Sequence, residues 1–275
     1  MIYLDGHVHI YQEFSLVDLF AAALGNLTRQ RELIAPAEPA SFLLLLTEGA
    51  GYNRFTELRR LVESGAGEFS GGWHLEKTAE ESSLRVVGRG RDTVNCLYLV
   101  AGRQLITRER LEVLALACPT LLADGRSLAE TVGEVRAAGG VAVLPWGVGK
   151  WLGRRGKIVE SYLQSADPEG LFVGDNGGRP VFWPEPGLFA TAARRRIGLL
   201  SGSDPLPLTG EERRCGGFGT SLTGDCGGQT PAADLQKALV EGKADLRPFG
   251  RRLALGQFLR TRLALQRRNK EIHPA

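Results

Sequence analysis

The chain has 275 residues, of which 43% are hydrophobic and 24% charged, an ordinary balance for a globular protein. Its formal net charge of +3 gives no argument for nucleic acid, and its four scattered cysteines form neither a disulfide framework nor a zinc knuckle. No apolar run reaches the roughly 20 residues of a membrane span, and the start has no signal-peptide pattern. We therefore expect a cytoplasmic protein with one domain over residues 1–275.

Seven short apolar runs, bounded by Gly, Pro or polar residues, predict buried strands. They lie at residues 2–4, 41–47, 94–100, 119–123, 141–144, 170–173 and 197–200. Amphipathic helices are expected between them at 16–31, 54–64, 111–117, 127–138, 157–166 and 186–196. This alternation indicates a parallel sheet with crossover helices, either closed as a (β/α) barrel or open and doubly wound. No Gly-x-Gly-x-x-Gly follows the first strand, which disfavours a dinucleotide-binding fold.

Three further segments stand outside this alternation. Residues 71–91 alternate like a hairpin inserted after the second strand, and residues 205–230 form a glycine-rich loop that is expected to fold over the strand ends. Cys215 and Cys226 in this loop are a disulfide pair, metal ligands or two unrelated thiols. Helices are expected at 231–241 and 249–270, within a C-terminal region over 231–270. The last helix has a basic face, which is either solvated or contacts an acidic partner or an anionic membrane surface, with nucleic acid disfavoured.

The most informative motif is His7-Val-His9, directly after the first strand. Residues i and i+2 of a strand point to the same face, so two imidazoles can converge on one metal ion. The chain has four histidines, and two of them lie in this tripeptide. We interpret His7 and His9 as part of a metal or substrate site, the alternative being two ordinary polar residues at a strand end.

Other polar side chains follow the predicted strands. In parallel α/β folds the functional site lies at the carboxyl ends of the strands. The preference of turns for Asp and Asn is an alternative explanation for Asp124 and Asn176. It explains less well why Glu48, Arg103, Lys150 and Arg179 gather there. The strand ends carry Asp5, His7, His9, Glu48, Arg103, Gln104, Asp124, Trp146, Lys150, Asp175, Asn176, Arg179, Ser201, Ser203 and Asp204.

Asp5-Gly-His-Val-His9 resembles the first-strand motif of the amidohydrolase superfamily and of the PHP (polymerase and histidinol phosphatase) family. Ser201-Gly-Ser-Asp204 resembles the last-strand motif of the same group, in which an aspartate binds metal or activates water. Seven strands suit the PHP barrel better than the eight-stranded amidohydrolase barrel. The resemblance covers the first and last strands, with topology alone between them. Leu206 stands where the PHP motif has a histidine, and the middle strands lack the further histidines of both families.

The resemblance implies a seven-stranded barrel and a metal-dependent hydrolase of phosphoesterase or amidohydrolase type. Because few histidines are present, a single zinc, manganese or iron ion is expected, rather than a di- or trinuclear centre. The cations at the strand ends favour a small anionic ester or phosphoester as substrate. The expected metal ligands are His7, His9, Asp204, Glu48 and Asp175, with His74 as a further option. The expected catalytic residues are Asp204 and Lys150, and the expected substrate-binding residues are Arg103, Arg179, Trp146 and Asn176.

Alternatives remain open at this stage. The missing histidines favour a second hypothesis, a barrel protein that has lost catalysis and has a binding or regulatory role. Lys150 is interpreted as a cation for an anionic substrate or as a carboxylated lysine between two metals. In the first case it acts together with Arg103, Arg154, Lys157 and Arg179. A third hypothesis is a metal-free lyase in which Lys150 is a Schiff-base amine.

Overall fold

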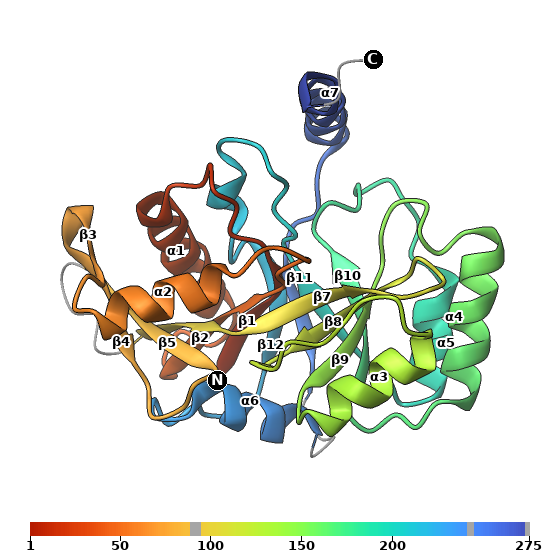
Figure 1. The fold of residues 1–275 in the computed structure, drawn as a ribbon, viewed down its shortest axis with the longest axis horizontal. Coiled ribbons are helices and arrows are strands. Elements are labelled where there is room, and N and C mark those ends of the chain that lie inside the picture. The colour runs from red at the N-terminus through yellow and green to blue at the C-terminus, as the bar shows by residue number, and fades with distance from the viewer. Residues whose placement is uncertain (89–94, 241–244, 273–275) are drawn as a thin grey trace.

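The computed structural model describes residues 1–88, 95–240 and 245–272, which form a mixed α/β protein with two mixed sheets (Figure 1). The larger sheet has eight strands in the order β13-β12-β1-β2-β6-β5-β4-β3, and the smaller has five in the order β11-β10-β9-β8-β7. The described residues form no closed barrel, so the expected seven-stranded ring of parallel strands is corrected to two sheets. The sheets meet along two seams, β1 against β11 and the end of β2 against β7.

The strands of the larger sheet are β1 (Ile2–Val8), β2 (Ala40–Leu46), β3 (Glu68–Phe69), β4 (Trp73–Lys77), β5 (Ser83–Val87), β6 (Asn95–Val100), β12 (Phe218–Leu222) and β13 (Arg247–Gly250). Those of the smaller sheet are β7 (Gly102–Ile106), β8 (Glu112–Leu116), β9 (Val141–Pro145), β10 (Leu171–Asn176) and β11 (Gly198–Gly202). The pairs β1–β2, β2–β6, β9–β10 and β10–β11 are parallel, and all other ladders are antiparallel.

The helices are α1 (Leu16–Ile34), α2 (Arg54–Glu63), α3 (Leu128–Ala137), α4 (Gly153–Ser165), α5 (Gly187–Arg194), α6 (Pro231–Val240) and α7 (Leu255–Ile272), with short 3₁₀ turns at Ser70–Gly72 and Glu211–Arg214. In Figure 1, α1 and α2 lie beside the larger sheet and α3, α4 and α5 beside the smaller one. Helix α6 and helix α7 lie at opposite ends of the strands (Figure 1). No described helix has the length and apolar character needed to span a bilayer.

The apolar side chains of β1 and β2 are buried on both faces, as the continuous apolar runs predict. Ile2 and Leu4 pack into a core between the two sheets, while Tyr3 packs on the other side with the residues under α1. A third cluster fills the space between the smaller sheet and α3, α4 and α5. Strand β1 pairs with β12 over Ile2–Leu4, while β2 and β11 lie beside its carboxyl end, so the strand is held along its whole length.

Several predicted elements are wrong, and the corrections bear on the site. Residues 111–117 are not a helix; they contain β8, which pairs antiparallel with both β7 and β9. Residues 119–123 form no strand, and Leu121 is 73% exposed. The glycine-rich segment contains β12, and the helix expected over 249–270 starts only at Leu255, after β13.

The remaining elements follow the prediction. The expected hairpin is β4–β5, which joins the larger sheet through β6. Residues 89–91 of the predicted hairpin, residue 94 of the predicted third strand and residue 241 of the predicted penultimate helix lie outside the described residues.

Candidate metal centre

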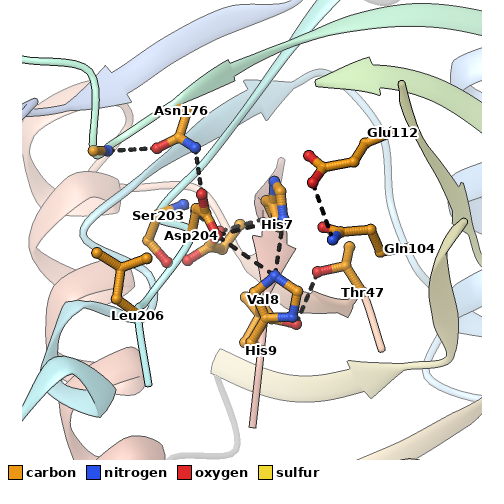
Figure 2. Close-up of polar contacts among 12 residues, drawn as sticks. His7, Val8, His9, Thr47, Gln104, Glu112, Asn176, Ser203, Asp204 and Leu206 are labelled. Carbon is orange, nitrogen blue, oxygen red and sulfur yellow. Dashed lines mark hydrogen bonds and ion pairs between the residues drawn. The ribbon is translucent and has the colours of Figure 1, made fainter. Parts of the chain in front are cut away.

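His7, His9 and Asp204 form one cluster at the seam between β1 and β11 (Figure 2). The two imidazole Nε2 atoms are 3.1 Å apart, and each lies 3.5 Å from Oδ1 of Asp204. The side chains are largely buried, with exposures of 6% for His7, 11% for His9 and 20% for Asp204. Two neutral imidazole nitrogens this close need a proton or a cation between them, because their lone pairs repel.

The local backbone explains how the carboxylate reaches the histidines. Asp204 follows β11 with φ of 46°, a left-handed conformation that is uncommon for a residue other than glycine. Its N–H donates to the carbonyl of His7 at 2.9 Å, which fixes the turn against β1. Such strained residues gather at functional sites, where the surrounding structure holds them in place.

Asn176, at the end of β10, orients the Asp204 carboxylate. Its Nδ2 donates to Oδ2 of Asp204, and its Oδ1 accepts from the N–H of Gly178 at 2.6 Å (Figure 2). With Oδ2 held by the amide, Oδ1 is the oxygen that faces the two imidazoles.

Asp5 stabilises the site through hydrogen bonds to the backbone and is not a member of the cluster. Its fully buried carboxylate accepts backbone N–H bonds from Ser203 at 2.8 Å, Gly216 at 2.8 Å and His7 at 3.3 Å. These donors come from β1, from the turn after β11 and from the glycine-rich segment. Burial raises the pKa of the Asp5 carboxyl to about 6, although the three N–H bonds oppose the shift. The carboxylate therefore ties together the segments that carry the cluster.

The electrostatics of the cluster suit metal binding. Burial lowers the pKa of His7, against the attraction of the Asp204 carboxylate, and this favours the neutral imidazole with a lone pair for a ligand. Burial opposes ionisation of Asp204, but the imidazole of His7 and hydrogen bonds from His9 and Asn176 together hold the pKa of its carboxyl below its usual range. Two imidazole nitrogens and one carboxylate oxygen are a donor set that zinc, iron and manganese accept. The three residues could hold one such ion.

The other two expected metal ligands lie outside this cluster. Oε1 of Glu48 accepts from the N–H of Phe55 at 2.7 Å in the first turn of α2, and burial raises the pKa of this carboxyl. Asp175 forms a buried bidentate pair with Arg179, at 2.8 Å to Nε and 2.7 Å to Nη2. Both carboxylates have structural partners.

The expected cations are also paired. Arg179 is occupied by Asp175, and Arg103 donates to the carbonyl of Tyr52 and to Oδ1 of Asn53, both at 2.7 Å. Lys150 contacts Oε1 of Glu112 through its Nζ. Of these three cations, Lys150 alone lines the pocket beside Asp204.

Glu112 is a site residue that the sequence analysis missed. Its side chain is 12% exposed, contacts Lys150 and lies 3.4 Å from Nε2 of Gln104 (Figure 2). Strand β8 runs antiparallel to β9, so its first residue lies at the edge where the parallel strands end. The mistaken helix over 111–117 concealed this placement.

Two pockets lie beside the cluster. One, of about 190 Å³, is lined by Asp204, Asn176, Trp146, Lys150 and Glu112, together with residues of α7. The other, of about 290 Å³, is lined by His9, Tyr11, Glu48, Tyr52 and Gln104. The expected substrate-binding residues Trp146 and Asn176 thus share a pocket with the expected catalytic residues Asp204 and Lys150.

Comparisons with known proteins show a distant structural likeness. No protein-family model and no curated protein matches the sequence. The structure resembles that of PsfC from Pseudomonas syringae PB-5123, with a TM-score of 0.51 and 13% identity over 98% of both chains. It also resembles the lesion-specific endonuclease PfuEndoQ from Pyrococcus furiosus, with a TM-score of 0.48 and 12% identity over 90% of this chain and 57% of that one. At this identity the likeness to PsfC shows a shared fold alone.

Proposed function

We propose that this protein is a metal-dependent hydrolase of the PHP or amidohydrolase kind that acts on a small anionic ester or phosphoester. The observation that carries the proposal is the convergence of His7, His9 and Asp204, two of them on the first strand and its end and one after the last strand of the smaller sheet. The two sequence motifs that resemble these families thus supply all three members of the cluster.

In this proposal His7, His9 and Asp204 hold one divalent ion of zinc, manganese or iron. A bound ion of this kind lowers the pKa of a coordinated water to near neutrality and polarises the scissile ester. Asp204 also serves as proton acceptor, while Asn176 keeps its carboxylate ionised and oriented. Trp146 forms part of the wall for the substrate.

Lys150 has a narrower role here than the sequence suggested. Its ammonium group contacts the Glu112 carboxylate, which neutralises most of its charge toward a substrate. This contact favours an ammonium over a carboxylated lysine, because a carbamate beside a carboxylate would be repelled. Arg103 and Arg179 have no place in the proposed substrate site, because they do not line the pocket.

The test is a metal count followed by an activity screen. Protein stripped with chelator is titrated with Zn²⁺, Mn²⁺ and Fe²⁺ and analysed by elemental analysis, in the wild type and in His7→Ala, Asp204→Ala and His74→Ala. His74 lies in the β4–β5 hairpin beside Glu76 and is the matched control. We expect one ion per chain in the wild type and the control and none in the other variants. A wild type that retains no stoichiometric ion would refute the proposal.

One observation favours a second candidate function, in which the protein binds a ligand or regulates a partner without catalysis. Within residues 1–88, 95–240 and 245–272, no other group of three potential ligands is brought together. If the metal-loaded wild type hydrolyses neither 4-nitrophenyl phosphate nor 4-nitrophenyl acetate, while His7→Ala still loses the ion, this second function is favoured.

A further inference from the structure

Helix α7 forms one wall of the pocket beside the metal centre. The side chains of Phe258, Thr261, Arg262 and Leu265 line it. Their spacing of i, i+3, i+4 and i+7 places them on one face of the helix. Figure 1 shows α7 beyond the ends of β10 and β11, separate from the two sheets.

Contacts near both ends of α7 hold it against the pocket. Just before the helix, Leu253 exchanges backbone bonds with the loop after β10, accepting from Val181 at 2.9 Å and donating to Gly177 at 3.1 Å. Toward its other end, Arg268 pairs with Glu13, in the loop before α1, at 2.6 Å. The helix is therefore fixed to loops that follow β10 and β1, the strands that carry Asn176 and His7.

Arg262 is the cation of this pocket that has no acidic partner in the described part of the chain. Its guanidinium lies 5.3 Å from the ring centre of Phe258, a cation–π contact that leaves its N–H edge available. The other lining cation, Lys150, contacts Glu112. A guanidinium can donate two parallel hydrogen bonds to a phosphate, which the compact ammonium group cannot.

Apolar side chains line the same pocket as Arg262 and Asp204. They are Trp146, Val148, Leu206, Leu253, Phe258 and Leu265. The volume of about 190 Å³ is comparable to the roughly 150 Å³ of an apolar cavity that holds one benzene molecule. A space of this size accommodates one ring beside an anionic group.

We infer that α7 is the substrate-selecting wall of this site, and that the pocket takes a phosphate monoester of an apolar alcohol of about one ring, with Arg262 binding the phosphate. This inference rests on the proposed function and names its substrate class. Hydrolysis would add water across the phosphate ester bond, giving inorganic phosphate and the alcohol. Arg262 is a specificity-determining residue in this scheme, because it contacts the anionic group.

The experiment measures binding of non-hydrolysable probes to the full chain by calorimetry, with and without one equivalent of Mn²⁺. The probes are phenylphosphonate, methylphosphonate, which lacks the ring, and benzyl alcohol, which lacks the charge. The variants are Arg262→Ala and the control Arg260→Ala. Arg260 is exposed and does not line the pocket, since a shift of two residues turns the side chain about 200° around a helix.

We expect the wild type and Arg260→Ala to bind phenylphosphonate at least fivefold more tightly than either other probe. Arg262→Ala should weaken phenylphosphonate binding about tenfold or more, because a charge-assisted hydrogen bond is lost. Equal binding in the two arginine variants, or equal affinity for phenylphosphonate and methylphosphonate, would overturn the inference.

Failure of the proposed function would look different. The effect of Arg262→Ala on phenylphosphonate affinity is also measured in the metal-free protein. Absence of metal binding in the wild type would therefore refute the hydrolase proposal, while the role of α7 in binding the probe could still be judged. Conversely, a normal metal count with no effect of Arg262→Ala would refute the inference alone.

Discussion

Replacing Gly202 with alanine should disrupt the seam on which the candidate metal centre depends. Gly202 ends β11 where this strand passes β1, and an added Cβ would lie 2.3 Å from the backbone N and 2.5 Å from the Cβ of His7. These neighbours belong to the backbone and to its first side-chain atom, so no rotamer change relieves the overlap. The two strands must separate, which moves Asp204 away from His7.

The magnitude follows from two contributions. Overpacking a filled interior costs about 1–3 kcal/mol, and a clash with backbone belongs at the upper end of that range. The hydrogen bond from the Asp204 N–H to the His7 carbonyl is lost as well, at about 1 kcal/mol. The sum of about 4 kcal/mol is a large fraction of the 5–15 kcal/mol that stabilises a typical protein. For a chain of this size it corresponds to a fall in Tm of about 8–16 °C.

The assay is urea unfolding followed by circular dichroism on chelator-treated protein, with a metal count on the same samples. Gly25→Ala is the matched control, because Gly25 lies in α1 and a Cβ there would meet no atom within 4 Å. Alanine at that exposed helical position should stabilise the protein by about 0.5–1 kcal/mol. If Gly202→Ala unfolds within about 0.5 kcal/mol of the wild type and still binds one ion, the reasoning about the seam is wrong.

Three further predictions concern the rest of the fold. Asp175→Ala leaves the Arg179 guanidinium buried without its carboxylate and should cost about 3–5 kcal/mol in urea unfolding, whereas Asp18→Ala, which removes an exposed ion pair, should cost less than about 1 kcal/mol. Similar losses in the two variants would contradict the assigned burial. Ser127→Ala removes the capping box of α3 and should lower the unfolding free energy by about 1 kcal/mol; no change would mean that the cap is not formed in solution. Burial raises the pKa of the Cys226 thiol in the folded protein to about 12, whereas the thiol of the unfolded chain has its ordinary pKa near 9. Between pH 9 and 12 the unfolded thiol therefore loses its proton while the folded one keeps it. Stability should therefore fall as the pH rises from 9 toward 12, and the slope should be shallower in Cys226→Ala by up to about 1.4 kcal/mol per pH unit. Identical slopes would contradict the buried thiol.

The strands that the sequence predicts well are those buried on both faces. The runs at 41–47, 141–144, 170–173 and 197–200 each overlap a parallel strand of the structure. A continuous apolar run bounded by turn residues has few other environments available in a chain of this size. The proximity of the histidine pair to Asp204 could be predicted from the sequence, because the carboxyl ends of parallel strands lie near one another.

The antiparallel strands are where sequence reasoning failed. Residues 112–116 are Glu, Val, Leu, Ala and Leu, of which four are good helix formers or neutral, yet pairing with β7 and β9 overrides that local preference. Strand β12 was missed because it lies in a glycine-rich segment. Gly219 is required there, since a Cβ would lie 2.1 Å from the carbonyl of Leu4, and this closeness is a property of the pairing that composition does not reveal.

The partners of the charged strand-end residues could not be predicted from the sequence, for a related reason. Position along the chain places Asp175, Arg179 and Glu48 near the edge of the sheet where the parallel strands end. Whether each side chain is available to a metal or substrate depends on its hydrogen-bond and ion-pair partners. Arg179 follows Asp175 by four residues and folds back on it, and Glu48 meets the first turn of α2. Neither contact depends on hydrophobic periodicity, which was the basis of the strand assignments.

The position of β1 has a consequence for how this protein matures during synthesis. Its neighbours include β12, and the hydrogen bond from Ser203 to Asp5 joins residues 198 positions apart. A growing chain would expose the first strand with one unpaired edge until β12, which ends at Leu222, has left the ribosome. Contacts of such long range form slowly, and an incomplete chain is open to aggregation meanwhile. Loading of an ion at this site would then require that β11, Asp204 and β12 have been synthesised, and chaperone dependence should centre on the interval before residue 222 emerges.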